Sequence, residues 1–146
     1  MIEHFKKIFV DTSPIIYLLD KKSPFCSKME KIFDFVLNQT SADVVTSSIT
    51  CTEYLVYPYR TNNLKAEKAF WKFLDECQID IRNIDITTAT KAAEIRAEYP
   101  HFKTPDALQL AAAVINGCDL FLTNDKQLKN FKEISCVTVE EWNFDR

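Results

Sequence analysis

The chain has 146 residues, 47% of them hydrophobic, so we expect one folded domain over residues 1–146 and exclude a disordered or fibrous protein. Eighteen basic and 21 acidic residues give a net charge of −3, which argues against a protein that coats nucleic acid without specificity. Five cysteines without a Cys-x-x-Cys pair and two histidines without metal-ligand spacing are typical of a reduced compartment.

No apolar run approaches the length that a membrane span needs, and the run at 8–10 is interrupted by Asp11. We therefore expect no signal peptide and no contact with a membrane. The sequence predicts a cytoplasmic protein.

Short apolar runs alternate with amphipathic stretches along the chain. In order, they predict strand 8–10, helix 14–19, helix 25–37, strand 43–46, a helix from about 49 that stops near Pro58, helix 64–76, strand 79–81, a helix to about 98, helix 105–116, strand 118–122, a short helix to 131 and a strand near 136–137. Parallel strands need a crossover between them, so this alternation predicts an α/β fold with a parallel sheet covered on both faces.

Helix ends and buried positions are also predicted from residue type. We expect N-caps at Ser13, at Ser47 or Ser48, at Thr87 or Thr88 and at Thr104. Gly117, the only glycine, is placed to end the helix at 105–116, which we expect to be largely buried. The helix at 64–76 is expected to bury Leu64, Phe70, Trp71 and Leu74.

Four acidic residues follow the predicted strands or begin the next helices. Asp11 ends the first strand, Glu53 lies early in the helix after the second, Asp106 begins the buried helix, and Asp125 follows the strand at 118–122. In a parallel sheet these positions share the carboxyl edge, where such folds bind ligands. We therefore expect the four carboxylates to face one crevice.

Each acid except Asp11 also has a structural interpretation that remains open. Asp106 at the second helical position complements the helix dipole, Asp125 suits an N-cap or Asx turn, and Thr50-x-x-Glu53 matches a capping box. Asp11 has no such duty if Ser13 and Pro14 begin the first helix, so it favours a functional role even alone.

Four neighbouring carboxylates repel one another unless their pKa values rise or a cation binds between them. Oxygen ligands alone select a hard ion, Mg²⁺ or Mn²⁺. Such an ion activates water and neutralises charge on a phosphodiester, so hydrolysis of that bond is the implied reaction. Ser13 and Thr123 lie beside two of the acids and are candidates to orient water or a phosphate oxygen, with local capping as the alternative.

Four segments in this order, Phe-Val-Asp11-Thr-Ser, Ser-Ile-Thr-Cys-Thr-Glu53-Tyr, Thr-Pro-Asp106-Ala-Leu-Gln and Leu-Thr-Asn-Asp125, resemble the PIN-domain ribonucleases, above all the VapC-like toxins of toxin–antitoxin pairs. The resemblance implies a three-layer α/β/α sandwich with a five-stranded parallel sheet. It also implies a Mg²⁺- or Mn²⁺-dependent endoribonuclease inhibited by a small antitoxin. Carried over by position, Asp11, Glu53, Asp106 and Asp125 would hold the metal, assisted by Ser13 and Thr123.

Two other functions remain open: a non-catalytic module with this fold that binds a partner, and a receiver-like or phosphatase domain phosphorylated on Asp11. Basic residues near element ends are candidates for an RNA-binding rim, namely Lys21, Lys22, Arg60, Lys103, Lys126 and Lys129. Aromatic residues in the segments 54–59 and 70–74 exceed the needs of one core-facing stripe and suggest a homodimer or antitoxin interface.

Overall fold

The computed structural model describes residues 4–144, and their strands form one five-stranded sheet. All neighbouring strands are parallel, in the order β3-β2-β1-β4-β5. The strands are β1 (Lys7–Val10), β2 (Asp43–Ser47), β3 (Asp80–Arg82), β4 (Leu120–Thr123) and β5 (Ser135–Thr138). The predicted parallel α/β fold is confirmed.

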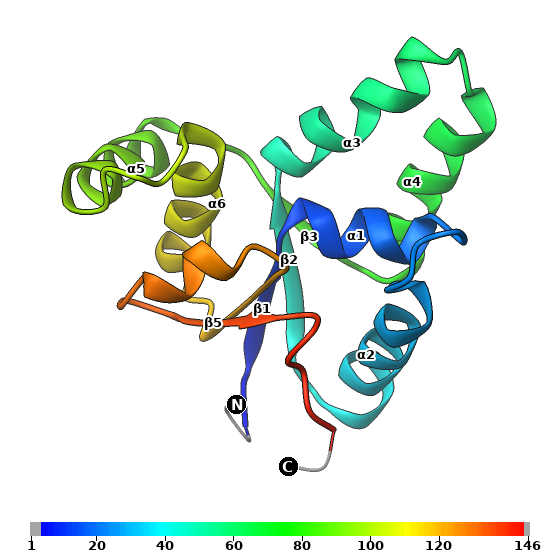
Figure 1. Ribbon diagram of the computed structural model, residues 1–146, viewed down its shortest axis with the longest axis horizontal. Coiled ribbons are helices and arrows are strands. Elements are labelled where there is room, and N and C mark those ends of the chain that lie inside the picture. Colours follow the sequence, from blue (N-terminus) through cyan, green and yellow to red (C-terminus); the bar gives the residue numbers. More distant parts are fainter. Residues whose placement is uncertain (1–3, 145–146) are drawn as a thin grey trace.

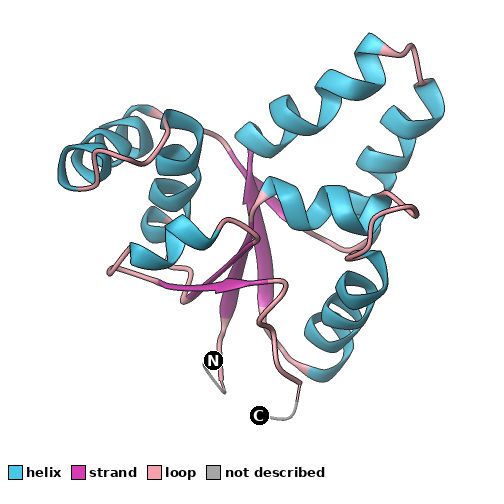
Figure 2. Ribbon diagram, in the orientation of Figure 1, coloured by secondary structure: helices cyan, strands magenta, loops and turns pink. Residues whose placement is uncertain are grey.

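Helices cover both faces of the sheet, which makes three layers (Figures 1 and 2). One face carries α1 (Thr12–Leu19), α2 (Cys26–Gln39), α3 (Ser48–Arg60) and α4 (Leu64–Glu76). The other carries α5 (Ile86–Glu98), α6 (Thr104–Ile115) and the short 3-10 helix η1 (Lys126–Asn130). Within residues 4–144, we find no helix that is both long and apolar enough for a membrane span.

Strand residues alternate between the two layers because successive side chains point to opposite faces. Ile8 and Val10 pack under α2, whereas Phe9 lies on the other face, stacked on Phe121 with ring centroids 5.2 Å apart. The alanines of α6 let that helix lie close to the sheet, and Ala107 and Ala111 are fully buried. This close packing fixes the start of α6 against the carboxyl edge.

Gly117 ends α6 as predicted. Its φ of +72° is the left-handed conformation that glycine adopts without strain. The N–H of Gly117 bonds to the carbonyl of Val114, and the N–H of Cys118 to that of Ala113 at 2.9 Å, which is a Schellman motif.

Three predicted helix starts are wrong, in each case because another residue precedes the expected cap. Asp11, not Ser13, caps α1, and its carboxylate accepts from the N–H of Thr12, so the expectation that Asp11 has no capping duty is also wrong. Asp85 caps α5 in place of Thr87 or Thr88, and accepts from the N–H of Thr88 at 2.8 Å. Lys103 precedes α6 without a side-chain cap, so Thr104 is the first helical residue rather than the cap.

The hairpin of α3 and α4 also departs from the prediction. α3 does not stop at Pro58 but continues to Arg60, because a proline in the last turn removes only one helical hydrogen bond. Leu64 and Trp71 were expected to be buried, but they are 59% and 43% exposed. The hairpin projects from the sheet (Figure 1), so α4 buries only a narrow stripe that includes Phe70 and Leu74.

Candidate active site at the carboxyl edge of the sheet

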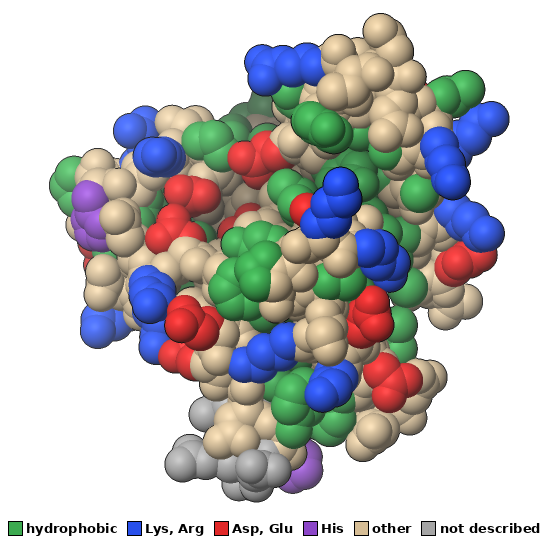
Figure 3. Space-filling view, turned by 45° about the vertical axis from the view of Figure 1, so that its right-hand side comes forward, with side chains coloured by type: hydrophobic (Ala, Val, Ile, Leu, Met, Phe, Trp, Pro, Cys, Tyr) green, Lys and Arg blue, Asp and Glu red, His purple; other side chains and the backbone are tan. Residues whose placement is uncertain are grey.

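The four predicted acids come from four elements that begin or end at one edge of the sheet. Asp11 follows β1, Glu53 lies in α3, Asp106 in the first turn of α6, and Asp125 between β4 and η1. Figure 3 shows acidic side chains around a hollow on one face of the molecule, with basic side chains farther out. The edge therefore gathers carboxylates from distant parts of the chain.

Asp11 is the most buried of the four, with 7% of its surface exposed. The pKa of Asp11 is raised from 3.8 to about 6, chiefly by burial and to a smaller extent by the nearby charges of Asp106 and Glu53. Hydrogen bonds from Thr123 and from the N–H of Thr12 act in the opposite direction and lower the pKa. Asp11 is thus held as an ionised group at a place where ionisation is costly.

Asp106 is half-buried and connects the acids electrostatically. Desolvation raises its pKa, and so do the charges of Asp125 and Glu53, while Lys103 lowers it. Glu53 is exposed and Asp125 is half-buried. The four carboxylates form one repelling group, which is the condition that a cation relieves.

The capping and helix-dipole roles predicted for Asp125, Asp106 and Glu53 have different outcomes in the structure. Asp125 does cap η1, accepting from the N–H of Gln127 at 3.0 Å. Asp106 is the third helical residue rather than the second, and still lies in the first turn, near the positive end of the helix dipole. No capping box forms around Glu53, because Ser47 caps α3 and Thr50 lies inside the helix.

The two predicted hydroxyl residues lie beside Asp11 and Asp125. Thr123 is buried and donates to Oδ2 of Asp11 at 2.8 Å, while its oxygen accepts from the N–H of Asp125 at 3.1 Å. Since its one hydrogen points at Asp11, Thr123 positions that carboxylate rather than a water molecule. Ser13 lines an open cleft together with Tyr17, Asn124 and Asp125.

The residues present fit a hard divalent ion by their chemistry, because carboxylate oxygens are its preferred ligands. Burial is the main cause of the raised pKa values of Asp11 and Asp106, and repulsion from the neighbouring acids adds to it. As the side chains lie, no three His, Cys, Asp or Glu residues within 4–144 are arranged to hold a metal ion. The metal ligands remain a prediction.

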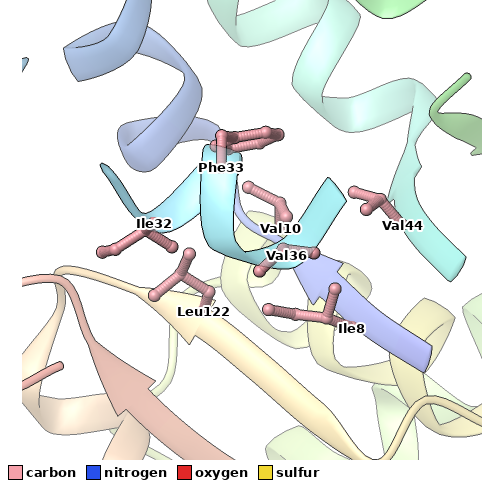
Figure 4. Close-up of a pocket in the computed structure, with 7 residues that line it drawn as sticks. All are labelled: Ile8, Val10, Ile32, Phe33, Val36, Val44 and Leu122. Carbon is pink, nitrogen blue, oxygen red and sulfur yellow. The ribbon is translucent and has the colours of Figure 1, made fainter. Parts of the chain in front are cut away.

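A second open groove reaches Glu53 from the side of the α3–α4 hairpin. It is lined by apolar side chains of α1 and α3, including Ile16, Leu19, Tyr54 and Tyr57. By contrast, the gap between α2 and the sheet in Figure 4 is closed core, without room for a water molecule. Binding surfaces on this side of the sheet therefore lie at its edge rather than beneath it.

The basic residues named for an RNA rim are all exposed. Lys21 pairs with Glu30, Lys126 with Glu140 and Lys129 with Glu141. Of the others, Lys103 lies close enough to Asp106 to lower its pKa, and Lys22 lines the groove that reaches Glu53.

Three buried polar residues at this edge were not predicted as site residues: Thr12, Thr50 and Gln109. Thr12 donates to Oε1 of Glu53 at 2.7 Å, and Gln109 approaches both Asp11 and Thr50. The sequence carried one signal for them, a lone glutamine three positions after Asp106 in a helix otherwise lined with apolar residues.

Comparison with known proteins identifies the family of this chain. The PIN domain family matches residues 8–134 of the chain. No curated protein matches its sequence.

Three solved structures illustrate the fold that this chain shares with other proteins. VapBC2 from Rickettsia felis, bound to a promoter DNA fragment, superposes with a TM-score of 0.73 at 14% identity, covering 90% of this chain and 98% of that one. A toxin–antitoxin complex from Klebsiella pneumoniae gives 0.68 at 24% identity, covering 90% and 97%. VapC20 from Mycobacterium tuberculosis, described as a sarcin–ricin loop cleaving toxin, gives 0.67 at 18% identity, covering 88% and 98%.

Proposed function

Because the chain belongs to the PIN domain family, we propose that it is a metal-dependent endoribonuclease and the toxin of a toxin–antitoxin pair. The observation that carries the proposal is the group of four carboxylates at the carboxyl edge, in which the charges of Asp106 and Glu53 act on Asp11 and those of Asp125 and Glu53 act on Asp106. A module that only binds a partner gains nothing from this repulsion. Among its structural neighbours, VapC20 is described as a sarcin–ricin loop cleaving toxin.

In this proposal Asp11, Glu53, Asp106 and Asp125 hold Mg²⁺ or Mn²⁺. When bound, the cation supplies an activated water and neutralises charge that develops on the scissile phosphate. Asp11 is fixed in place by three donors, the N–H of Thr12, Gln109 and Thr123. Ser13 stands on the cleft beside Asp125 and orients water or a phosphate oxygen.

Exposed basic side chains near the edge, such as Lys22, Arg60 and Lys103, are suited to bind the RNA backbone around this acidic centre. A cytoplasmic location fits an RNA substrate.

An antitoxin and a second copy of the chain are the proposed protein partners. Exposed apolar side chains on the α3–α4 hairpin, Val56, Tyr57, Tyr59, Leu64 and Trp71, support a protein interface there. Light scattering of the purified chain tests the homodimer, and a monomer at micromolar concentration would contradict it. An antitoxin that occupies the groove next to Glu53 is expected to slow RNA cleavage.

The test of the enzymatic proposal is cleavage of total RNA in Mn²⁺, with and without a chelator. We expect the native protein to cleave only with the metal, and Asp11→Asn to be inactive while it remains folded. Asp34→Asn, which changes an exposed aspartate of α2, is the control and should cleave normally. Cleavage without metal, or full activity of Asp11→Asn, would contradict the proposal.

A further inference from the structure

Gln109 is an amide in the apolar centre of α6, and only 1% of its surface is exposed. Its Nε2 lies 2.8 Å from the hydroxyl of Thr50, and 3.3 Å from both Oδ1 of Asp11 and the hydroxyl of Thr12. Its Oε1 accepts from the hydroxyl of Ser47. One side chain thus connects α6 with the ends of β1 and β2 and with α3.

The neighbouring hydroxyls leave little choice of donor in this network. Thr46 donates to the carbonyl of Val10 at 2.9 Å, so in its 2.8 Å contact with Thr50 the hydrogen comes from Thr50. Thr12 donates its hydrogen to Glu53. The hydroxyls of Thr50 and Thr12 thus each already donate their one hydrogen, so toward Gln109 each can only accept a hydrogen bond.

The two N–H groups of Gln109 are then the hydrogens available to Thr50, Thr12 and Asp11. This requirement fixes the orientation of the amide, with Nε2 toward the acceptors and Oε1 toward Ser47. A buried amide is costly unless its hydrogen bonds are made, and a methionine would fill the same space without that cost. Gln109 therefore serves the polar network rather than the core.

We propose that Gln109 is a positioning residue that fixes Asp11 directly, and Glu53 through Thr12, in one mutual arrangement for metal binding. Gln109 and the N–H of Thr12 both donate to Oδ1 of Asp11. Within residues 4–144 the other oxygen, Oδ2, accepts only from Thr123, so it retains a lone pair that a cation can use. The inference rests on the proposed function, since it gives Gln109 a task within that metal site.

Two variants test it by removing the donor in different ways. Gln109→Met keeps the volume and removes both polar ends. Gln109→Glu keeps the size and an oxygen for Ser47, but places an acceptor where the amide donates. Thr88→Val is the control, because Thr88 is equally buried and its hydroxyl bond is made to Asp85, outside this network.

A second pair of variants, at Thr12, tests the hydrogen bond that connects the Gln109 network with Glu53. Thr12→Val removes the hydroxyl that connects Gln109 with Glu53, whereas Thr12→Ser retains it. If Gln109→Met fails to fold, Gln109→Glu and this pair still decide the question.

The measurements are Mn²⁺ affinity by calorimetry on the RNA-free protein, kcat and KM for RNA cleavage, and thermal unfolding as a check on folding. We expect both Gln109 variants and Thr12→Val to bind Mn²⁺ about tenfold or more weakly, as is typical for residues that orient metal ligands. We expect kcat to fall by about the same factor with KM little changed, and Thr12→Ser and Thr88→Val to behave as the native protein.

Folded Gln109 variants with native Mn²⁺ affinity and native kcat would overturn the inference and leave the proposed function standing. If the native protein binds Mn²⁺ but does not cleave RNA, the proposed function is wrong, and the affinities still judge the role of Gln109. Absence of Mn²⁺ binding by the native protein would overturn both.

Discussion

The hydroxyl of Thr123 donates a 2.8 Å hydrogen bond to Oδ2 of Asp11, across 112 positions of sequence. The same hydroxyl accepts from the N–H of Asp125. Thr123 therefore joins the buried acid at the end of β1 to the acid that follows β4. Thr138 pairs with Thr123 in register on the adjacent strand, and its hydroxyl accepts from the N–H of Glu141 instead.

This pair of threonines allows a matched comparison. We expect Thr123→Val to lower the free energy of unfolding by about 1–3 kcal/mol, because it leaves a buried carboxylate with one donor fewer. It should also reduce RNA cleavage and move its pH profile upward, since the Thr123 bond lowers the pKa of Asp11. Thr138→Val should lower the free energy of unfolding but leave RNA cleavage and its pH profile unchanged. Equal loss of cleavage in both variants would mean that Thr123 acts only on stability.

The pKa of Asp11 predicts a pH dependence of stability. Its folded pKa of about 6 lies above the ordinary value of 3.8, so the folded protein holds this proton more tightly than the unfolded chain. The stabilisation of the folded state by protonated Asp11 is therefore fully present below pH 3.8, and it is lost as the pH rises through about 6. A difference of about two pKa units corresponds to about 3 kcal/mol.

Urea unfolding of the native protein and Asp11→Asn between pH 4 and 8, in a chelator, measures this effect. Because carboxylates outside this acidic group titrate alike in both proteins, the difference between them reports Asp11 together with its coupling to Asp106 and Glu53. Asp11→Asn should gain stability relative to the native protein as the pH rises. If the difference in free energy of unfolding between the two proteins stays constant with pH, burial does not raise the pKa of Asp11.

The fold and the positions of the four acids followed from the sequence because both depend on local pattern and on a general rule. Apolar runs and amphipathic periods place strands and helices, and a parallel sheet brings the carboxyl ends of its strands to one edge. That rule alone was enough to predict that Asp11, Asp106 and Asp125 lie at the same edge of the sheet.

The details around them did not follow, because they depend on partners distant in sequence. Two of the three wrong helix starts arose where an earlier aspartate takes the cap position, Asp11 before Ser13 and Asp85 before Thr87. Gln109 gains its role from Ser47 and Thr50, which are 62 and 59 positions away. Its place among apolar residues of α6 marks it as unusual, but the sequence does not identify these distant partners. Leu64 and Trp71 match a buried stripe, and only the projection of the hairpin exposes them.

Gly117→Ala tests the helix end that the sequence did predict. A Cβ at this position would meet no atom within 4 Å, so the cost lies in the backbone conformation alone. We expect a loss of about 1–2 kcal/mol, the strain of a left-handed residue with a side chain. Gly117 lies beyond the opposite end of α6 from Asp106, so RNA cleavage at 25 °C should be unchanged. Thermal unfolding combined with a cleavage assay measures both.

Asp106→Asn separates a role in the metal site from a role in the helix dipole. Burial and repulsion from Asp125 and Glu53 raise the pKa of Asp106, and the substitution relieves both. It also forfeits an interaction with the helix dipole of about 0.3–1 kcal/mol. We expect these effects to offset each other, so that metal-free stability changes by less than about 1 kcal/mol. Asp85→Ala, which removes the cap of α5, should cost about 1 kcal/mol.

Adding Mn²⁺ reverses the order of these variants. A ligand that binds only the folded state stabilises it by about 2.7 kcal/mol at 100 times its dissociation constant. Native protein and Asp85→Ala should both show this rise in the midpoint of thermal unfolding, whereas Asp106→Asn should show little of it and lose RNA cleavage. A large loss of metal-free stability in Asp106→Asn, with an intact response to Mn²⁺, would instead assign Asp106 to the helix.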